Sequence, residues 1–213
     1  MSYISQVLPS LLDGASVSLQ VFFIVLILSI PLGAILAFLM QIPFRLLRYL
    51  LTVYIWIMRG TPLLLQLIFI YYVLPSVGIS IDRMPAAIIA FTLNYAAYFA
   101  EIFRGGIAAI PRGQYEAAKV LKFTPVQTVR YIILPQVIKI VLPSVFNEVI
   151  TLVKDTSLVY VIGVGDLHLA SRTAANRDAS LAPMFIAGAI YLIMIGIVTL
   201  ISKQVEKKYD YYK

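Results

Sequence analysis

The chain has 213 residues, of which 61% are hydrophobic and 13% are charged, and its mean hydropathy is +0.92. Soluble domains are about half apolar and about a quarter charged, so this composition excludes an ordinary water-soluble globule. There is no cysteine and a single histidine, His168, which excludes disulfides and thiolate metal sites and leaves no His-rich metal cluster to propose.

Five apolar segments are long enough to cross a lipid bilayer. They cover residues 15–40, 49–74, 85 into the 100s, 131–153 and 182–201. Their side chains do not alternate between apolar and polar, which argues for helices and against a transmembrane barrel. We therefore predict an all-α membrane protein with five transmembrane helices in a single domain, residues 1–213. Residues 1–14 contain no basic stretch, so we do not expect a cleaved signal peptide.

Loop charges predict the orientation of these spans, because Lys and Arg concentrate on the cytoplasmic side. Basic residues follow spans one, three and five: Arg45, Arg48, Arg104, Arg112, Lys119, Lys122, Arg130, Lys203, Lys207, Lys208 and Lys213. With five spans all three regions fall on one side, which places the N-terminus outside and the C-terminus in the cytoplasm. The net charge of +7 is explained by these loops, and no nucleic-acid partner is expected.

The loop between spans three and four, at about residues 111–130, has helical character. Glu116, Ala117 and Ala118 are strong helix formers, and the Thr124-Pro125 pair is a stop signal. A short surface helix with small side chains is suited to docking in a groove of another protein, but periodicity alone favours a solvated loop helix. A second irregular segment, residues 155–181, opens with an apolar stretch at 157–164 that we expect to form a short helix at the membrane.

Four sequence motifs resemble those of ABC-importer permeases of the polar amino acid uptake subfamily. Glu-Ala-Ala at 116–118 with Ile-Leu-Pro at 133–135 is similar to the EAA loop of that family. The other three are residues 59–66 (RGTPLLLQ), residues 95–106 with Glu101, Arg104 and two glycines, and residues 154–158 (KDTSL) followed by 161–164 (VIGV). They occur in the family's order and the resemblance covers nearly the whole chain. One position departs, because Lys122 stands where the family usually has a glycine that permits the turn after the helix.

The resemblance implies a type I ABC-importer transmembrane domain in the cell membrane of a prokaryote. Its partners would be a second permease subunit, as a homodimer or heterodimer, two ATP-binding subunits and an external solute-binding protein. The EAA loop would be the coupling helix, with Tyr115, Glu116, Ala117, Ala118, Leu121 and Lys122 contacting the ATPase subunit. The substrate would be an amino acid, ATP and Mg²⁺ would bind the partner, and this chain would hold no cofactor.

Polar side chains inside the spans are the candidates for substrate binding, because ionisable groups there usually face a cavity or a partner. Glu148 suits a substrate ammonium group, although a helix–helix hydrogen bond or a pairing with Arg59 or Lys154 is also open. Asp155 lies seven residues later, so a continuous helix would put both carboxylates on one face. Asp155 is also a candidate helix cap. Together the two carboxylates suggest a basic substrate such as arginine, lysine or histidine.

Four further residues complete the predicted substrate site. Asn94 can both donate and accept, but an interhelical hydrogen bond is an equal alternative. Arg59 directly precedes Gly60-Thr61-Pro62, where the helix should weaken. It would face a substrate carboxylate, clamp a gate or, as the favoured alternative, form a structural ion pair. Thr61 and Tyr95 lie in two of the motifs that resemble the permease family, and we expect them to contact the substrate. For Tyr95 the alternative is a packing role.

Enzymatic chemistry is not expected of this chain. It contains no Walker A sequence and no nucleophile–base set or paired-carboxylate acid/base site. Glu101 and Arg104, spaced i and i+3, are expected to pair structurally. The rival function is an ion-coupled secondary transporter, which would use intramembrane carboxylates for protons or sodium. A second rival is a membrane scaffold that recruits a soluble protein.

Overall fold

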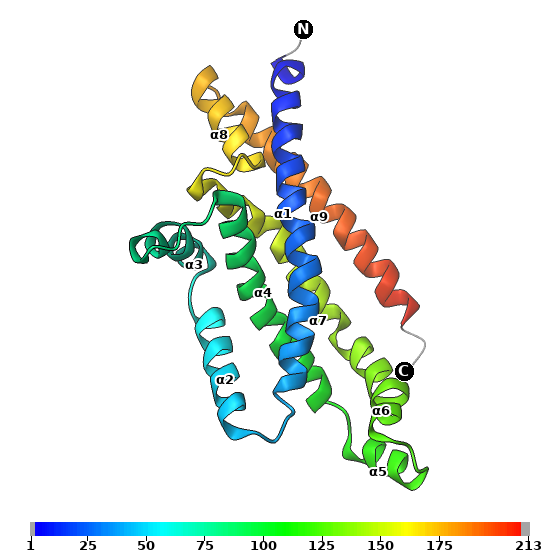
Figure 1. The fold of residues 1–213 in the computed structure, drawn as a ribbon. Coiled ribbons are helices and arrows are strands. Elements are labelled where there is room, and N and C mark those ends of the chain that lie inside the picture. The colour runs from blue at the N-terminus through cyan, green and yellow to red at the C-terminus, as the bar shows by residue number, and fades with distance from the viewer. Residues whose placement is uncertain (1–2, 210–213) are drawn as a thin grey trace.

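The computed structural model describes residues 3–209, and these residues form helices joined by short turns (Figure 1). The long helices are α1 (Tyr3–Leu39), α2 (Arg45–Gly60), α4 (Arg83–Ala108), α7 (Leu134–Asp155), α8 (Leu167–Asp178) and α9 (Ala182–Lys208). The shorter ones are α3 (Leu63–Ile68), α5 (Arg112–Val120) and α6 (Pro125–Thr128), with π-helical turns at Phe69–Val73 and Val129–Ile133 and 3-10 turns at Leu74–Val77 and Thr156–Ile162.

Four of the predicted spans are long apolar helices. They are Tyr3–Leu39, Arg83–Ala108, the segment Pro125–Ile162 that contains α7, and Ala182–Lys208. The first is longer than predicted: its 37 residues extend about 55 Å at about 1.5 Å per residue. Because the hydrocarbon core is about 30 Å thick, α1 must project beyond it.

The remaining predicted span is broken. α2 and the helix that follows it, Leu63–Val77, meet at 105°, so they count as one span only if the bent pair crosses the membrane together. The cause lies in two residues. Pro62 has no backbone N–H and pushes the preceding residue out of the helical region, and Thr61 is accordingly extended (φ −118°, ψ 145°).

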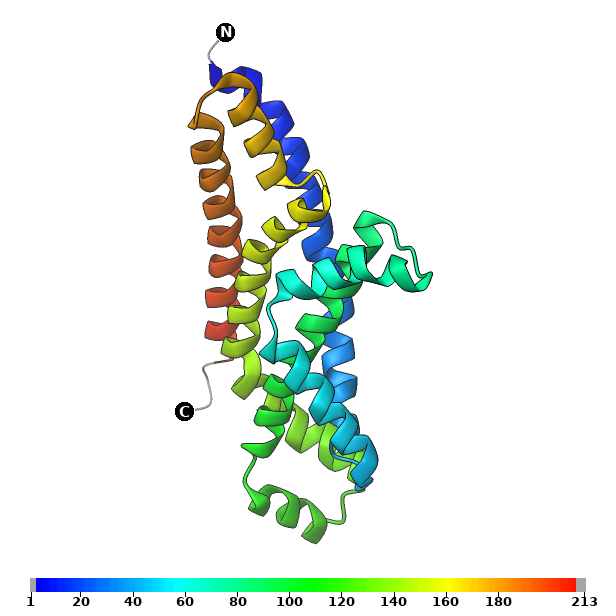
Figure 2. The same ribbon diagram turned by 90° about the vertical axis from the view of Figure 1, so that its left-hand side faces the viewer.

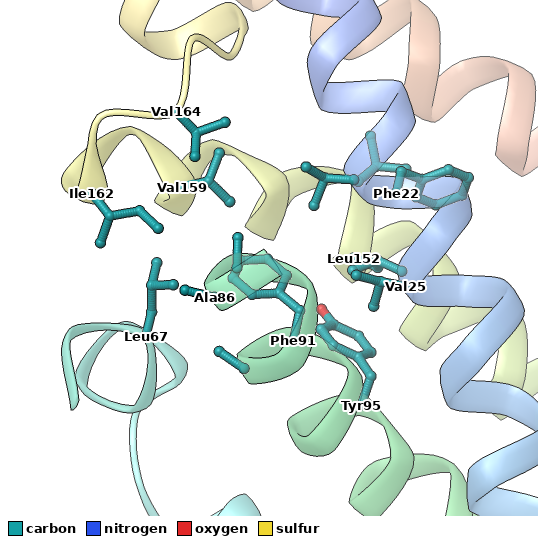
Figure 3. Packing of buried hydrophobic residues seen from close by; sticks show 14 of the residues in the cluster. Phe22, Val25, Leu67, Ala86, Phe91, Tyr95, Leu152, Val159, Ile162 and Val164 are labelled. Atoms are coloured by element: carbon teal, nitrogen blue, oxygen red, sulfur yellow. The ribbon is translucent and has the colours of Figure 1, made fainter. Parts of the chain in front are cut away.

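α4 is the central helix, and its buried face is rich in alanine. Ala86, Ala87, Ala90, Ala96, Ala97 and Ala100 are all buried. Small side chains let neighbouring helices approach closely, which drives helix packing in lipid, where the hydrophobic effect is absent. α1 uses Gly33 for the same purpose, because a Cβ there would lie 2.6 Å from the Cβ of Phe99. Above this contact, Phe91 and Tyr95 of α4 pack with Phe22 of α1 and Leu152 of α7 (Figure 3).

The two ends of the molecule differ in charge. The N-terminus and α8 lie at one end, while the α1–α2 turn, α5 and the last turns of α9 lie toward the other (Figures 1 and 2). The three basic regions thus gather toward one end, as the loop charges predicted; Lys213 lies outside the described residues.

The long connection after α7 contains more structure than the sequence predicted. The expected short helix is the 3-10 turn Thr156–Ile162, but α8 was not expected. Asp166 caps α8, and its carboxylate accepts 3.0 Å hydrogen bonds from the backbone N–H groups of His168 and Leu169. Burial raises the pKa of Asp166 against the lowering effect of these hydrogen bonds. α8 packs on α1 at Gly14, where a Cβ would lie 2.8 Å from the Asp166 carbonyl oxygen.

Candidate functional site: a polar cavity at the broken span

A network of amide and hydroxyl groups fixes the break between α2 and α3. The Thr61 hydroxyl donates to the Ile57 carbonyl at 2.8 Å and accepts from Gln66 Nε2 at 2.7 Å. The amide nitrogen of Asn94, on α4, donates to the Met58 carbonyl at 2.9 Å and to Gln66 Oε1 at 3.0 Å. The bond from Asn94 satisfies the Met58 carbonyl, whose partner in a continuous helix would be residue 62, a proline without an N–H. Satisfied backbone groups are the requirement for an irregular backbone inside a membrane.

A cavity of about 550 Å³ opens beside this break, between α2, α3, α4 and α7. It is lined by Arg59, Gly60, Thr61, Pro62, Leu63, Leu64, Asn94, Tyr95, Tyr98, Glu148, Thr151, Asp155 and Leu158. All six predicted substrate-binding residues are in this set, although they come from three separate regions of the chain. The fold therefore brings the predicted site residues together.

The two carboxylates share one wall of the cavity, as their seven-residue spacing on α7 predicted. The Tyr95 hydroxyl donates to Asp155 Oδ2 at 2.7 Å, so Asp155 is held by α4 across the core. Asp155 is the last residue of α7, and its carboxylate makes this bond instead of the predicted cap on the following turn. Glu148 is half-buried two turns earlier. Within residues 3–209 the ion pairs are Arg104–Glu101 and Arg177–Asp178, so Glu148 pairs with neither Arg59 nor Lys154.

Arg59 supplies a cation on the other side of the cavity. Its guanidinium lies 5.4 Å from the ring centroid of Tyr98, in a cation–π contact. The favoured structural ion pair is thus not formed by Arg59 in the described part of the chain. A ligand that carries both an ammonium and a carboxylate group would meet opposite charges at Glu148 and Asp155 on one side and Arg59 on the other.

Asn94 has a structural position in this site. It is 4% exposed, and both N–H groups of its amide serve the α2–α3 break, which is the interhelical alternative that the sequence left open. Gln66 is the residue that sequence reasoning missed. Its place at the end of the RGTPLLLQ motif, four residues after the proline, was the available signal.

A second cavity, of about 610 Å³, continues from Arg59 toward the end of the molecule that carries α5. Its charged lining residues are Arg48, Arg59, Glu101 and Arg104. Arg104 pairs with Glu101 as predicted, with Nε donating to Oε2 at 2.9 Å. Since Arg59 lines both cavities, polar lining extends along α2 from the helix break to this end.

The predicted coupling segment is helical and lies at one tip of the molecule (Figure 1). α5 runs from Arg112 to Val120, inside the loop at about residues 111–130 that was predicted to have helical character. Tyr115, Glu116 and Ala117 are exposed, and Leu121 is 68% exposed. Ala118 differs from the other predicted coupling residues, because it is 1% exposed and packs inward. The contact of this segment with an ATPase subunit stays a prediction.

Lys122 adopts the backbone conformation that favours glycine. Its φ of 57° is in the left-handed region, so the turn after α5 keeps its shape and the lysine is strained. Thr124 then begins α6 with a capping box, its side chain accepting from the Gln127 backbone N–H at 3.3 Å.

Comparisons with known proteins show which proteins this chain resembles in sequence. The sequence profile of the family described as "Binding-protein-dependent transport system inner membrane component" matches residues 29–211. The arginine transport system permease protein ArtQ of Bacillus subtilis is 39% identical over 94% of this chain and 93% of its own. The L-cystine transport system permease protein TcyB of the same organism is 38% identical over 87% of this chain and 82% of its own. The putative glutamine transport system permease protein GlnP of Rickettsia felis is 35% identical over 97% of both chains.

Solved structures agree with these relatives. A chain from the crystal structure of an amino acid ABC transporter with histidines superposes with a TM-score of 0.90 and 32% identity, covering 98% of this chain and 99% of that one. A chain of the MetNI methionine ABC transporter in an inward-facing conformation shares the fold with a TM-score of 0.73, at 21% identity.

Proposed function

The chain belongs to the family of binding-protein-dependent transport system inner membrane components, and from this premise we propose that it lines a translocation pathway for basic amino acids. Members of this family are multi-pass, non-catalytic permease subunits of ABC importers, and ATP hydrolysis resides in a separate subunit. Such permeases work with an ATPase and a solute-binding protein.

The observation that carries the substrate proposal is the charge of the cavity at the helix break. Glu148 and Asp155 face it from α7, and Arg59 faces it from the end of α2. Every α-amino acid has an ammonium and a carboxylate, which one carboxylate and Arg59 would bind. The additional carboxylate gives a cationic side chain a partner that a neutral side chain does not use. Relatives named for arginine transport and a structure with histidines support a basic substrate, whereas relatives named for cystine and glutamine leave uncharged ones open.

Removing the charge of Glu148 tests whether the substrate is a basic amino acid. We expect Glu148→Gln to lower ATP-driven arginine uptake about ten-fold or more, because a hydrogen bond to a charged group contributes about 1.5–3 kcal/mol. Uptake of glutamine by the same proteoliposomes should change by less than about three-fold. Thr151→Ser, on the same wall of the cavity, is the matched control that preserves all charges. Unchanged arginine uptake in Glu148→Gln would contradict the basic-substrate proposal and leave the permease assignment standing.

The orientation follows from the basic end of the molecule. We place the α1–α2 turn, α5 and the end of α9 in the cytoplasm, because Lys and Arg cluster there, and the N-terminus and α8 outside. Cysteine substitutions make this testable, since the natural chain has none. A membrane-impermeant thiol reagent added to right-side-out vesicles should label Ser180→Cys and leave Gly113→Cys unlabelled.

We further propose that α5 is the coupling helix and that the chain pairs with a second permease subunit, identical or related, and two ATPase subunits. α5 is short, projects from the bundle and presents exposed Tyr115, Ala117 and Leu121. An importer of this design takes up substrate only with ATP and the ATPase subunit. A secondary transporter would instead take up substrate in response to an ion gradient alone.

A further inference from the structure

A basic pocket opens between α7 and α9, away from the cavity at the helix break. It has a volume of about 400 Å³ and is lined by Lys139, Leu142, Pro143, Lys203, Glu206, Lys207 and Tyr209. The two helices lie side by side in both views (Figures 1 and 2). The lining residues come from the first half of α7 and from the last turns of α9 with the residue that follows it.

The pocket carries an excess of positive charge. Lys203 and Lys207 of α9 line it with one carboxylate, Glu206, and α7 contributes Lys139 to the lining. That carboxylate accepts a hydrogen bond from the Ser202 hydroxyl at 3.2 Å within α9. Lys203 and Lys207, one turn apart on α9, are both exposed. An anionic group in the pocket would therefore be attracted by Lys203 and Lys207.

The pocket lies at the charged end of α9, beyond the apolar part of that helix. Lys203, Glu206 and Lys207 belong to its last turns, whereas the residues of α9 before Ser202 are mostly apolar. Immediately toward the membrane centre, α9 exposes large aliphatic side chains: Leu192 at 71%, Ile193 at 62%, Ile197 at 54% and Leu200 at 63%. The charged pocket is thus followed along α9 by exposed aliphatic side chains, and Tyr209, which lines the pocket, is an aromatic of the kind enriched at membrane interfaces.

We propose that this pocket binds the phosphate of an anionic glycerophospholipid, whose acyl chains lie along the exposed aliphatic face of α9. A soluble phosphate would satisfy the lysines alone, whereas a phospholipid would also cover the exposed aliphatic side chains of α9. Basic pockets between transmembrane helices at the cytoplasmic surface are suited to anionic headgroups, and each lysine near such a surface contributes about 1 kcal/mol, or about five-fold in affinity.

The test uses the intact transporter with its ATPase subunits, purified in detergent and given phosphatidylglycerol or phosphatidylcholine. Native mass spectrometry measures the dissociation constant of each bound lipid. We expect the wild-type complex to prefer phosphatidylglycerol, and the double variant Lys203→Gln/Lys207→Gln to bind it about 25-fold more weakly. Lys208→Gln, which removes the same charge beside the pocket, should change the affinity by less than about three-fold. Lys203→Arg should retain the preference.

Each remaining outcome bears on the proposal. Equal affinity for the two lipids in the wild type, or an equal loss in Lys208→Gln and the double variant, would overturn a defined headgroup site. Competition by glycerol 3-phosphate at the same concentration as the lipid would overturn the lipid assignment in favour of a soluble phosphate. Weak competition by glycerol 3-phosphate supports it, because the acyl chains then supply much of the affinity. Equal thermal unfolding of all variants in phosphatidylcholine shows that folding is unaffected.

Discussion

The bond between Tyr95 and Asp155 joins the centre of α4 to the end of α7 and positions one carboxylate of the proposed substrate site. Tyr95 is 2% exposed, and its hydroxyl donates to Asp155 over 2.7 Å. We expect Tyr95→Phe to destabilise the transporter by about 1–2 kcal/mol and to weaken arginine transport, because a buried acceptor loses its partner. Thermal unfolding and uptake in proteoliposomes measure the two effects. Tyr98→Phe keeps the ring beside Arg59 and should change neither by a comparable amount.

Two adjacent glycines on α4 make a matched pair for testing helix packing. A Cβ at Gly106 would lie 2.2 Å from Val141 Cγ1 on α7, whereas a Cβ at Gly105 would meet no atom of the described residues within 4 Å. Gly106→Ala should therefore lower stability by about 1–3 kcal/mol through overpacking. Gly105→Ala should be neutral or stabilise by up to about 1 kcal/mol, because alanine restricts the unfolded chain. Equal melting temperatures for the two variants would contradict the close α4–α7 contact.

At the scale of residues, the sequence predicted correctly how residues of the same helix lie relative to each other. The spacing of Glu148 and Asp155 placed both on one face, and that of Glu101 and Arg104 predicted their ion pair. It failed where a partner lies on another helix. Nothing in the sequence places Tyr95 against Asp155, 60 residues away, or Gln66 against Asn94. These contacts depend on helix packing, which local spacing does not encode.

Among the elements, the coupling segment carries a strained residue that makes a clear prediction. Lys122 has φ 57°, and a residue with a Cβ in this conformation costs about 1–2 kcal/mol. Lys122→Gly should therefore raise the stability of the α5 turn, by about 1 kcal/mol after the added entropy of the unfolded chain is subtracted. Lys119→Gly, inside α5, should lower it by about 1 kcal/mol. Hydrogen exchange of α5 amides measures both changes, and slower exchange in Lys119→Gly than in Lys122→Gly would refute the assignment of strain.

The junction between α1 and α8 should respond to acid. Asp178 accepts from the Tyr3 hydroxyl at 2.7 Å and pairs with Arg177, and these contacts lower the pKa of Asp178 to about 2. An unfolded aspartate titrates near pH ~3.9. The stabilisation is therefore fully present above about pH 4 and is lost as the pH falls through about 2. Thermal unfolding between pH 5 and pH 2 should show this loss in the wild type and a smaller one in Asp178→Asn. The same acid dependence in both proteins would show that the contacts of Asp178 with Tyr3 and Arg177 do not stabilise the junction.

Most of the helices were predictable because lipid requires long apolar helical segments, and the break at Gly60-Thr61-Pro62 was signalled by its residue types. α8 was not predicted. It has a polar surface and lacks a long apolar run, so the available sign was Asp166 as a helix cap before Leu167. The true length of α1 was also missed, because residues 3–14 form helix that packs on α8 rather than a run that is apolar all round.

On the scale of the whole molecule, a polar cavity lies at the break in one span, a second cavity continues toward the basic end, and a short helix projects from that end. This arrangement suits a subunit in which a motor protein acts at α5 and the cavities open alternately to the two sides of the membrane. Because α6 and α7 follow α5 directly in the chain, a displacement of α5 would be transmitted to the helix that carries Glu148 and Asp155.

The most direct test of this account is co-purification of the ATPase subunit with Leu121→Asp, compared with Leu181→Asp, whose similarly exposed leucine lies at the opposite end of the bundle. The account predicts that Leu121→Asp loses the ATPase subunit and ATP-driven uptake, while Leu181→Asp retains the ATPase subunit. Full retention of the ATPase and of uptake by a folded Leu121→Asp protein would contradict it.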